Sequence, residues 1–152
     1  MGTVGGTSSI EIEAPIGVVY DAAADAEASP RWQPEIKLAE CVERDADGNQ
    51  ALVHMETDAR VRRLNSDLRF SYEEPKRISW VQEKGDVKSV EGSWALEDLG
   101  GERTRVTYQL EVDLGRTLGL LIRGPLVGVL SSQLVDKMPE RLKRFVEDGA
   151  GG

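Results

Sequence analysis

The stretch ALVHMETDARVRRLNSDLRFSYEEP, residues 51–75, decides how this chain folds. Apolar side chains alternate with polar ones from Ala51 to Val61 and again from Leu64 to Tyr72, and Glu74-Pro75 ends the second run. Successive side chains of a strand point to opposite faces of a sheet. The alternation therefore predicts two strands that are each buried on one face only.

Three more alternating runs follow, and turn-forming residues separate the strands from one another. The runs cover residues 78–82, 90–96 and 106–114. The turns contain Asp47-Gly48-Asn49, Lys84-Gly85-Asp86 and Gly100-Gly101. Glycine and asparagine supply the positive φ angles that tight hairpins require, so the sequence predicts an antiparallel meander between residues 51 and 114.

The segment before the meander predicts a strand, two short helices and a second strand. The first strand covers Ser9–Ala14 and runs into Pro15, which suits the first turn of a helix over Ile16–Ala24. A second short helix is expected over Trp32–Ile36, and a strand over Leu38–Arg44. The buried set of that strand stays open between two pairs, Leu38 with Val42 or Ala39 with Cys41.

A long helix is expected at the C-terminal end, from Pro125 to Glu147. Its apolar side chains recur at the spacing of one helix face, which should pack over the sheet. This stripe consists of Leu130, Leu134, Met138, Leu142 and Phe145. Pro139 lies within the stripe and has no backbone N–H, so it should either kink the helix or divide it in two.

Length and charge predict one domain and exclude one class of partner. The 152 residues suffice for a core with a cavity beside it, and we expect a single domain over residues 8–148 with flexible tails at 1–7 and 149–152. The 27 Asp and Glu against 19 Lys and Arg give a formal net charge of −8, which disfavours binding to nucleic acid. The N-terminus shows no signal pattern, so a cytoplasmic location is expected.

The counts of cysteine and histidine argue against a metal centre and a catalytic triad. Cys41 is the one cysteine and His54 the one histidine, whereas a structural zinc ion usually takes four such ligands. His54 falls opposite the apolar stripe of its strand, so we expect it to face solvent. The sequence also lacks the glycine-rich loops that hold nucleotide phosphates, and we expect neither a metal nor another cofactor.

Several short motifs resemble those of one known family. They are Ile10–Pro15, Pro30-Arg31-Trp32, Tyr72–Pro75 with Ile78-Ser79-Trp80, Glu91–Trp94, and Thr104–Tyr108 through Val112–Leu114. Over about residues 8–147 the chain resembles the polyketide cyclase/dehydrase family of the START-like (SRPBCC) superfamily, and within it the small actinobacterial members of unknown substrate.

The resemblance implies an α+β helix-grip fold. In this fold a curved antiparallel seven-stranded sheet wraps around a long C-terminal helix, and two short helices follow the first strand. A cavity between sheet and helix is implied as well, because the members share a cavity rather than a catalytic motif.

Polar residues on the apolar face of the meander are the first candidates for a cavity lining. Each of them needs a hydrogen-bond partner there, since an unpaired buried polar group costs on the order of 1–3 kcal/mol. They are Thr57, Ser66, Tyr72, Gln82 and Tyr108.

Further candidates combine the apolar face with the resemblance. Gly92 either opens space beside Trp94 or marks a bulge that lets the sheet curve. The resemblance alone makes Trp80 and Trp94 walls of the pocket and Trp32 a cap between the short helices and the sheet. No catalytic residue is assigned. The full expected lining is Met55, Thr57, Ser66, Phe70, Tyr72, Trp80, Gln82, Gly92, Trp94, Tyr108, Leu110, Leu130, Leu134 and Met138.

The segment 115–130 is expected to form the mouth of the cavity. Its glycines loosen the backbone, and its apolar side chains exceed what one helix face can bury. Its apolar runs are too short to span a bilayer, so we expect it to contact a membrane surface peripherally or a second subunit in a homodimer. The expected rim residues are Arg116, Leu118, Ile122 and Arg123.

Three functions of different classes follow from these observations. The first is the binding or transfer of a hydrophobic small molecule, such as a lipid, a quinone or a polyketide-like ring. The second is a cyclase or dehydratase activity in which Tyr108, Tyr72 or Gln82 polarises a carbonyl, although the inner face shows no acid/base pair. The third is a protein-interaction module whose cavity is vestigial and whose contact is the apolar segment 118–130.

Overall fold

A computed structural model describes residues 3–149 of the chain. Its strands are β1 (Thr3–Ile12), β2 (Ile36–Arg44), β3 (Gln50–Asp58), β4 (Arg63–Glu73), β5 (Arg77–Gly85), β6 (Ser89–Gly100) and β7 (Arg103–Asp113). Its helices are α1 (Ile16–Ala24), the 3-10 helix η1 (Ala26–Arg31), α2 (Gly115–Leu121), α3 (Pro125–Ser131), the π-helical turn η2 (Ser132–Asp136) and α4 (Met138–Glu147).

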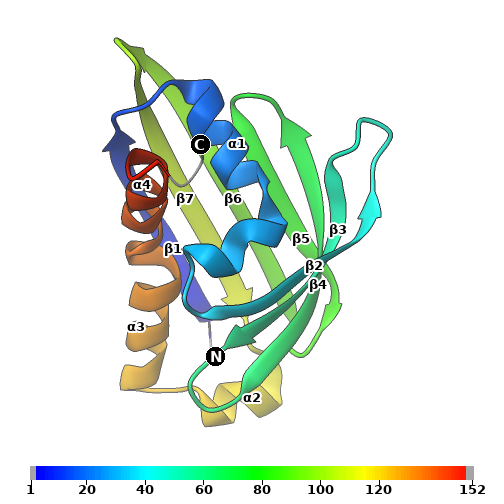
Figure 1. Ribbon diagram of the computed structural model, residues 1–152. Coiled ribbons are helices and arrows are strands. Elements are labelled where there is room, and N and C mark those ends of the chain that lie inside the picture. Colours follow the sequence, from blue (N-terminus) through cyan, green and yellow to red (C-terminus); the bar gives the residue numbers. More distant parts are fainter. Residues whose placement is uncertain (1–2, 150–152) are drawn as a thin grey trace.

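The seven strands form one antiparallel sheet in the order β1-β7-β6-β5-β4-β3-β2. From β2 to β7 each strand pairs with the next one along the chain, which confirms the meander, and β1 pairs with β7 at the far edge. Register shifts interrupt the β2–β3 and β4–β5 pairs, and such bulges bend a sheet. The helices α1, α3 and α4 cover its concave face (Figure 1). This is the helix-grip α+β arrangement.

The C-terminal helix changes its winding just before Pro139. The Lys137 N–H donates to the Ser132 carbonyl at 3.1 Å, five residues back, instead of the usual four. Proline cannot donate to the preceding turn, and its ring clashes with the carbonyl four residues earlier. The wider π turn η2 absorbs this conflict, so Pro139 divides the α-helix into α3 and α4 without ending the helical segment.

The expected tail over residues 1–7 is wrong for residues 3–7, because β1 begins at Thr3 and pairs along its length with β7. Here glycine allows the backbones of β1 and β7 to lie close together, and it does not make the segment mobile. A Cβ at Gly5 would lie 2.3 Å from the Leu110 carbonyl oxygen, and the Gly5 N–H donates to Ser131 Oγ at 3.2 Å. Of the other expected tail, Gly149 is described, whereas residues 1–2 and 150–152 lie outside the described residues.

The second short helix also lies elsewhere than expected. The structure has η1 at Ala26–Arg31 and no helix over Trp32–Ile36. Pro34 explains the difference, since the residue before a proline is pushed out of the helical region. The strand after it, β2, turns Ala39 and Cys41 inward and leaves Leu38 and Val42 exposed.

The alternation identifies the buried face of the meander, with one exception at a strand end. Ala51, Val53 and Met55 of β3 are buried, as is Ala59 just beyond it. Val61 does not continue the stripe, because β3 ends at Asp58 and the chain reverses at Arg60 with a φ angle of 71°.

A second hydrophobic cluster lies at the lower end of the molecule in Figure 1, where α2 is placed. We call it the basal cluster. It consists of Val4, Ala59, Val87, Leu114, Leu118, Ile122 and Leu130. It joins the β3–β4 turn, the β5–β6 turn and α2, which are far apart in the sequence.

Candidate functional site

A cavity of about 140 Å³ lies between the concave face of the sheet and the helices. Strands β3 to β7 supply most of its wall, and the helical segment 122–138 closes it from the other side. Its lining contains no Asp, Glu, Lys, Arg or His side chain. The cavity therefore offers an apolar surface with a few neutral polar groups.

Most of the residues that the sequence suggested for a cavity surround this space. They are Met55, Thr57, Ser66, Phe70, Trp80, Trp94, Tyr108, Leu110, Leu130, Leu134 and Met138. Tyr72, Gln82 and Gly92 share the inward face of their strands but do not line the cavity. The periodicity identifies the face, and the hydrogen bonds and packing of each side chain decide what reaches the cavity.

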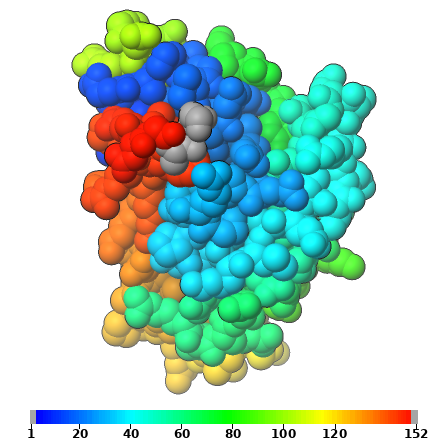
Figure 2. Space-filling view, in the orientation of Figure 1, coloured from blue at the N-terminus to red at the C-terminus, as the bar shows by residue number. Residues whose placement is uncertain are grey.

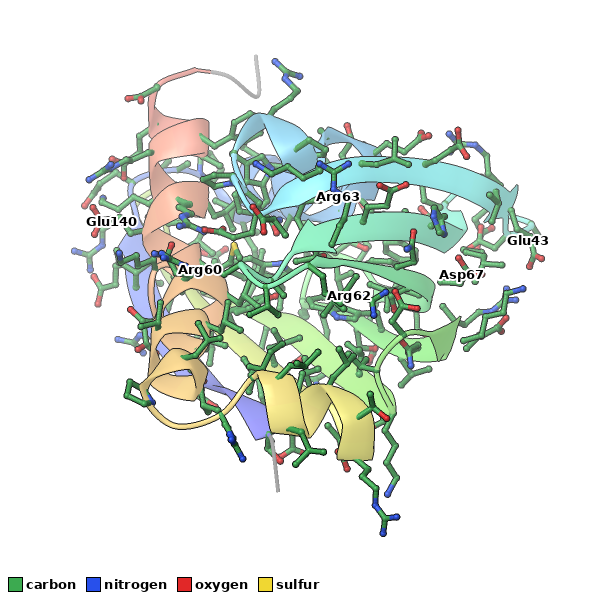
Figure 3. The ribbon with its side chains drawn as sticks, turned by 90° about the horizontal axis from the view of Figure 1, so that it is seen from below. Glu43, Arg60, Arg62, Arg63, Asp67 and Glu140 are labelled. Atoms are coloured by element: carbon green, nitrogen blue, oxygen red, sulfur yellow. The ribbon has the colours of Figure 1, made fainter. Side chains whose placement is uncertain are left out.

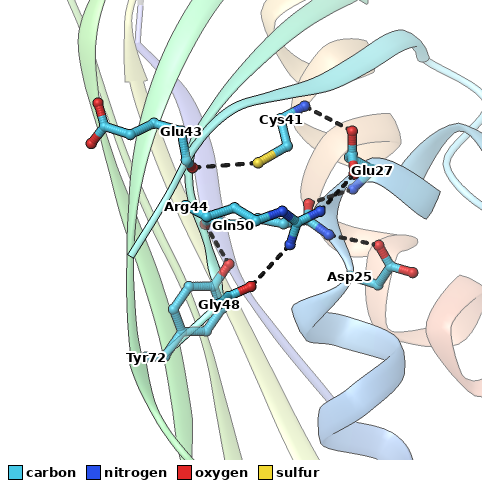
Figure 4. A network of polar contacts seen from close by, with 8 residues as sticks. All are labelled: Asp25, Glu27, Cys41, Glu43, Arg44, Gly48, Gln50 and Tyr72. Atoms are coloured by element: carbon cyan, nitrogen blue, oxygen red, sulfur yellow. Dashed lines mark hydrogen bonds and ion pairs between the residues drawn. The ribbon is translucent and has the colours of Figure 1, made fainter. Parts of the chain in front are cut away.

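Tyr72 is part of a polar network at the edge of the sheet (Figure 4). Its hydroxyl donates to the Gln50 carbonyl at 2.7 Å, and burial raises the pKa of this hydroxyl. The Gln50 amide in turn donates to Asp25 Oδ1 at 2.9 Å and accepts from the Glu27 N–H at 2.9 Å. Glu27 also accepts from the Cys41 N–H at 2.9 Å. The network fastens η1 to β2 and β3, so the expected cavity role of Tyr72 is corrected to a structural one.

Gln82 has its polar atoms satisfied inside the protein. The Ser66 hydroxyl donates to Gln82 Oε1 at 2.7 Å, and Gln82 Nε2 donates to the Val87 carbonyl at 3.0 Å. Ser66 lines the cavity with its donor already used. Neither side chain is therefore free to polarise a carbonyl of a bound molecule.

Gly92 neither opens the cavity nor marks a bulge. It pairs in unbroken register with Trp80 on one side and Leu110 on the other. A Cβ built on Gly92 would lie 2.4 Å from atoms of the Trp80 indole. Glycine is needed here because the indole lies flat against the backbone, and that position makes Trp80 a wall of the cavity.

We expect Gly92→Ala to lower the free energy of unfolding by about 1–3 kcal/mol in urea denaturation, because the added methyl group displaces the indole. In a protein that already carries Trp80→Leu, adding Gly92→Ala should lower the free energy of unfolding by less than it does in the unmodified protein. Gly17→Ala is a matched control, since Gly17 lies in α1 with open space around it. Equal losses from both alanines would contradict this packing.

Seven of the eight aromatic side chains form one continuous chain across the core. Its order is Phe145, Trp32, Trp94, Tyr108, Trp80, Phe70 and Tyr72, with neighbouring ring centroids 4.4–6.2 Å apart. Trp32 directly follows η1, and its ring lies between those of Trp94 in the sheet and Phe145 of α4. Three of the rings at the centre, Trp94, Tyr108 and Trp80, line the cavity.

Tyr108 presents a buried phenol hydroxyl in the lining of the cavity. It is 6% exposed, and burial raises the pKa of this hydroxyl, which therefore stays protonated at physiological pH. Among the described residues the buried side-chain polar atom without a hydrogen-bond partner is Trp32 Nε1, not the Tyr108 hydroxyl. Tyr108 can donate one neutral hydrogen bond to a carbonyl or hydroxyl group. No carboxylate or imidazole in the lining can accept a proton from substrate.

His54 lies on the outer face of the sheet, as its place in β3 predicts. Its Nδ1 atom is 2.6 Å from Asp67 Oδ1 and its Nε2 atom is 4.0 Å from Glu56 Oε2. The histidine and the cavity are thus separated by the sheet.

Several lining residues carry no recognisable signal in the sequence. The segment from α1 to the start of β2 adds Ala23, Ala26, Ser29, Gln33 and Ile36, because η1 lies earlier than expected. Val4 of β1, in the segment expected to be a flexible tail, also lines the cavity. These positions become lining only through tertiary packing.

The expected rim of the cavity divides into a buried and an exposed pair. Leu118 and Ile122 are 4% and 0% exposed, so their assignment to the mouth is corrected: both belong to the basal cluster, and Ile122 lines the cavity. Arg116 and Arg123 are exposed and do not line it. No single described helix is long and apolar enough to cross a bilayer, and α2 with residues 125–147 passes that test only as a pair bent by 105°.

A half-buried ion pair joins the C-terminal helix to the η1–β2 connection. Both nitrogens of the Arg141 guanidinium contact the Glu35 carboxylate, at 2.6 and 3.3 Å. The same guanidinium donates to the Gln133 carbonyl at 2.9 Å and to its side-chain oxygen at 3.2 Å. Because Gln33 and Ile36 line the cavity on either side of Glu35, this pair fixes one part of the wall.

Comparison with known proteins relates this geometry to a family. The family described as "Polyketide cyclase / dehydrase and lipid transport" matches residues 12–143. No curated protein matches the chain. A START superfamily protein from Mycobacterium smegmatis superposes with a TM-score of 0.81 at 22% identity, over 95% of this chain and 97% of that one.

Two further solved structures show the same fold. A protein from Thermus thermophilus superposes with a TM-score of 0.79 at 22% identity, over 97% of this chain and 99% of that one. The Zhui aromatase/cyclase from Streptomyces superposes with a TM-score of 0.71 at 18% identity, over 99% of both chains. At such identities the likeness establishes the fold alone.

Proposed function

Since this chain belongs to the polyketide cyclase/dehydrase and lipid transport family, we propose that it binds or transfers a hydrophobic small molecule in the cavity between the sheet and the C-terminal helix. The observation that carries the proposal is a lining of apolar and aromatic side chains without an acidic or basic group. Such a surface suits a lipid, a quinone or a polyketide-like ring. A cytoplasmic location is part of this proposal.

The size of the cavity sets a condition on the ligand. Pockets for drug-sized molecules usually measure roughly 300–1,000 Å³, and an apolar cavity of roughly 150 Å³ holds a benzene ring. At about 140 Å³ the space described here accepts one ring without rearrangement. A larger ligand has to displace side chains of the wall, and Phe70 and Leu134 are among its half-buried residues.

A cyclase or dehydratase activity is the second candidate, and one observation supports it. Tyr108 is buried, lines the cavity and keeps its hydroxyl protonated, so it can donate a hydrogen bond that polarises a substrate carbonyl. The lining supplies no side chain to take up the proton that such a reaction releases. Binding is therefore ranked first.

We expect Thr57→Phe to weaken the binding of a fluorescent fatty acid and of a neutral polycyclic dye by at least about tenfold, because the ring fills the cavity. Leu52→Phe is the matched control, since Leu52 directly precedes the buried residue Val53 in the same strand and therefore lies on the outer face. Titration of probe fluorescence measures both affinities.

Absence of binding by either probe to the unmodified protein would overturn the proposal and favour a protein-interaction module with a vestigial cavity. Tyr108→Phe separates the two remaining functions. It should leave the affinity of the apolar dye within about twofold, whereas a cyclase would lose turnover with little loss of substrate binding.

We propose that ligand enters and leaves the cavity at the segment 115–130. Its contact with a membrane or with a second copy of the chain was expected from the sequence. Ile122 and Leu130 from this segment line the cavity, which supports a role in loading.

A further inference from the structure

Exposed apolar side chains gather at the lower end of the molecule. Leu120 and Leu121 end α2 with exposed fractions of 62% and 55%, and Val61 in the β3–β4 turn is 47% exposed. Figures 1 and 2 place α2 and this turn at the same end of the molecule. We call these three residues the basal patch. Large apolar side chains grouped on a surface mark an interaction site rather than ordinary exposure.

Arginines accompany the basal patch on both segments. The β3–β4 turn carries Arg60 and Arg62, and Arg63 begins β4; Figure 3 labels all three in the view from this end. Arg116 and Arg123 flank the apolar end of α2. Arg62 lies 3.9 Å from Asp86 and Arg63 lies 3.3 Å from Glu56. Within residues 3–149 the structure shows no ion pair for Arg60, Arg116 or Arg123, so their charge is available to a partner.

Basic and acidic residues are unevenly distributed between this end of the molecule and the rest. Residues 59–64, 84–88 and 115–130 contain seven of the 19 basic residues and one of the 27 acidic residues. Two of the seven pair with acids just outside these segments, Arg63 with Glu56 and Lys88 with Asp113. These segments meet in the basal cluster through Ala59, Val87 and Leu118. The remainder holds 12 basic and 26 acidic residues. A protein with a net charge of −8 therefore presents one basic end.

The combination of charge and apolar surface selects the kind of partner. A second copy of the chain that docks through the same patch brings arginines against arginines, because a two-fold contact uses the same surface twice. A nucleic acid would use the arginines but would leave Leu120 and Leu121 exposed. An anionic bilayer takes both, with arginines at the lipid phosphates and leucines at the acyl boundary.

We propose that the basal patch docks on an anionic lipid bilayer. The inference rests on the proposed function, because an apolar ligand would be collected or released at such a boundary. The docking segments also form the wall of the cavity: Ile122 and Leu130 follow the exposed leucines, and Ala59 and Leu64 flank the turn arginines. A ligand that passes between bilayer and cavity therefore has a short apolar route.

The backbone at Arg60 provides a variant that removes a charge without harming the fold. Arg60 adopts a φ angle of 71°, a region that glycine occupies without strain. The Arg60 N–H donates to Asp58 Oδ1 at 2.9 Å, and glycine keeps this bond. Arg60→Gly should therefore retain the melting temperature of the unmodified protein while it weakens docking.

Co-sedimentation with vesicles tests the proposal. The vesicles are phosphatidylcholine alone or phosphatidylcholine with roughly a third phosphatidylserine, at low and high salt. We expect binding to the mixed vesicles only, reduced by salt. Leu120→Ser with Leu121→Ser should lower the partition coefficient at least about tenfold, and Arg60→Gly or Arg123→Gln about fivefold each.

Matched controls come from other surfaces of the molecule. Val18→Ser with Val81→Ser removes two side chains of 46% and 48% exposure, and Arg103→Gln removes one exposed charge from the β6–β7 end. These variants should bind vesicles like the unmodified protein. Equal binding to both vesicle types, absence of binding, or equal losses in the controls would overturn the proposal.

A dimer in sedimentation velocity that Leu120→Ser with Leu121→Ser dissociates, together with absence of vesicle binding, would assign the patch to self-association instead. Probe titration without vesicles keeps the two proposals apart. If the unmodified protein binds the probes but no vesicles, docking alone is refuted; if it binds the mixed vesicles but neither probe, the proposed function alone is refuted.

Discussion

Arg141→Ala is expected to lower the free energy of unfolding by about 2–4 kcal/mol, because it leaves the Glu35 carboxylate half-buried without its counter-charge. The side chains of Arg141 and Glu35 are 17% and 15% exposed. Because solvent reaches the pair, the loss in free energy of unfolding should be smaller than for a fully buried ion pair. Urea denaturation should show a lower midpoint at an unchanged slope. Around Gln33 and Ile36 the wall of the cavity should loosen, and probe affinity should fall with it.

The C-terminal helix supplies a control for this prediction. Arg144, three residues further on, pairs with Glu140 at 2.7 Å but is 74% exposed, so Arg144→Ala should cost under about 0.5 kcal/mol. Replacing both partners, as in Arg141→Met with Glu35→Gln, should recover part of the stability, because no buried charge is then left alone. If the two arginine variants lose equal stability, the pair does not fix the wall.

Trp94→Ala is expected to cost about 3–5 kcal/mol, the range for truncating a large buried aromatic side chain. Trp94 is 2% exposed, and its ring lies 4.4 Å from that of Tyr108 and 6.1 Å from that of Trp32. In a domain of this size 1 kcal/mol corresponds to about 2–4 °C, so the melting temperature should fall by at least about 6 °C.

Added indole should raise the melting temperature of the Trp94→Ala variant more than that of the unmodified protein, because it refills the space left by the side chain. His54→Ala, on the outer face, should change neither stability nor the response to indole to a comparable extent. A variant that indole does not stabilise has collapsed around the lost ring, which would contradict a rigid aromatic wall.

The sequence predicts those parts of this molecule that depend on periodicity. The faces of β3 to β7 follow from alternation, and that is enough to bring Met55, Thr57, Phe70 and Tyr108 together around a cavity. The family motifs add the two tryptophans of the wall. These inferences succeed because a strand of a one-sided sheet has only two ways to face.

Periodicity does not determine close contact between backbones or the partners of polar atoms. The glycines at the N-terminus suggest mobility, yet Gly5 is required by the 2.3 Å approach of the Leu110 carbonyl to its Cβ position. Gln82 and Tyr72 face inward as predicted, but their partners, Val87 and Gln50, take their polar groups away from the cavity. Such contacts join segments that are distant in the sequence, and a local sequence pattern does not show which distant segments come together.

The chain of aromatic rings also gives this protein an optical property. All three tryptophans belong to it: Trp80 and Trp94 line the cavity, and the ring of Trp32 lies 6.1 Å from that of Trp94. Near-ultraviolet circular dichroism and tryptophan emission therefore report directly on the contents of the cavity, and a conjugated ligand should quench the emission without any added label.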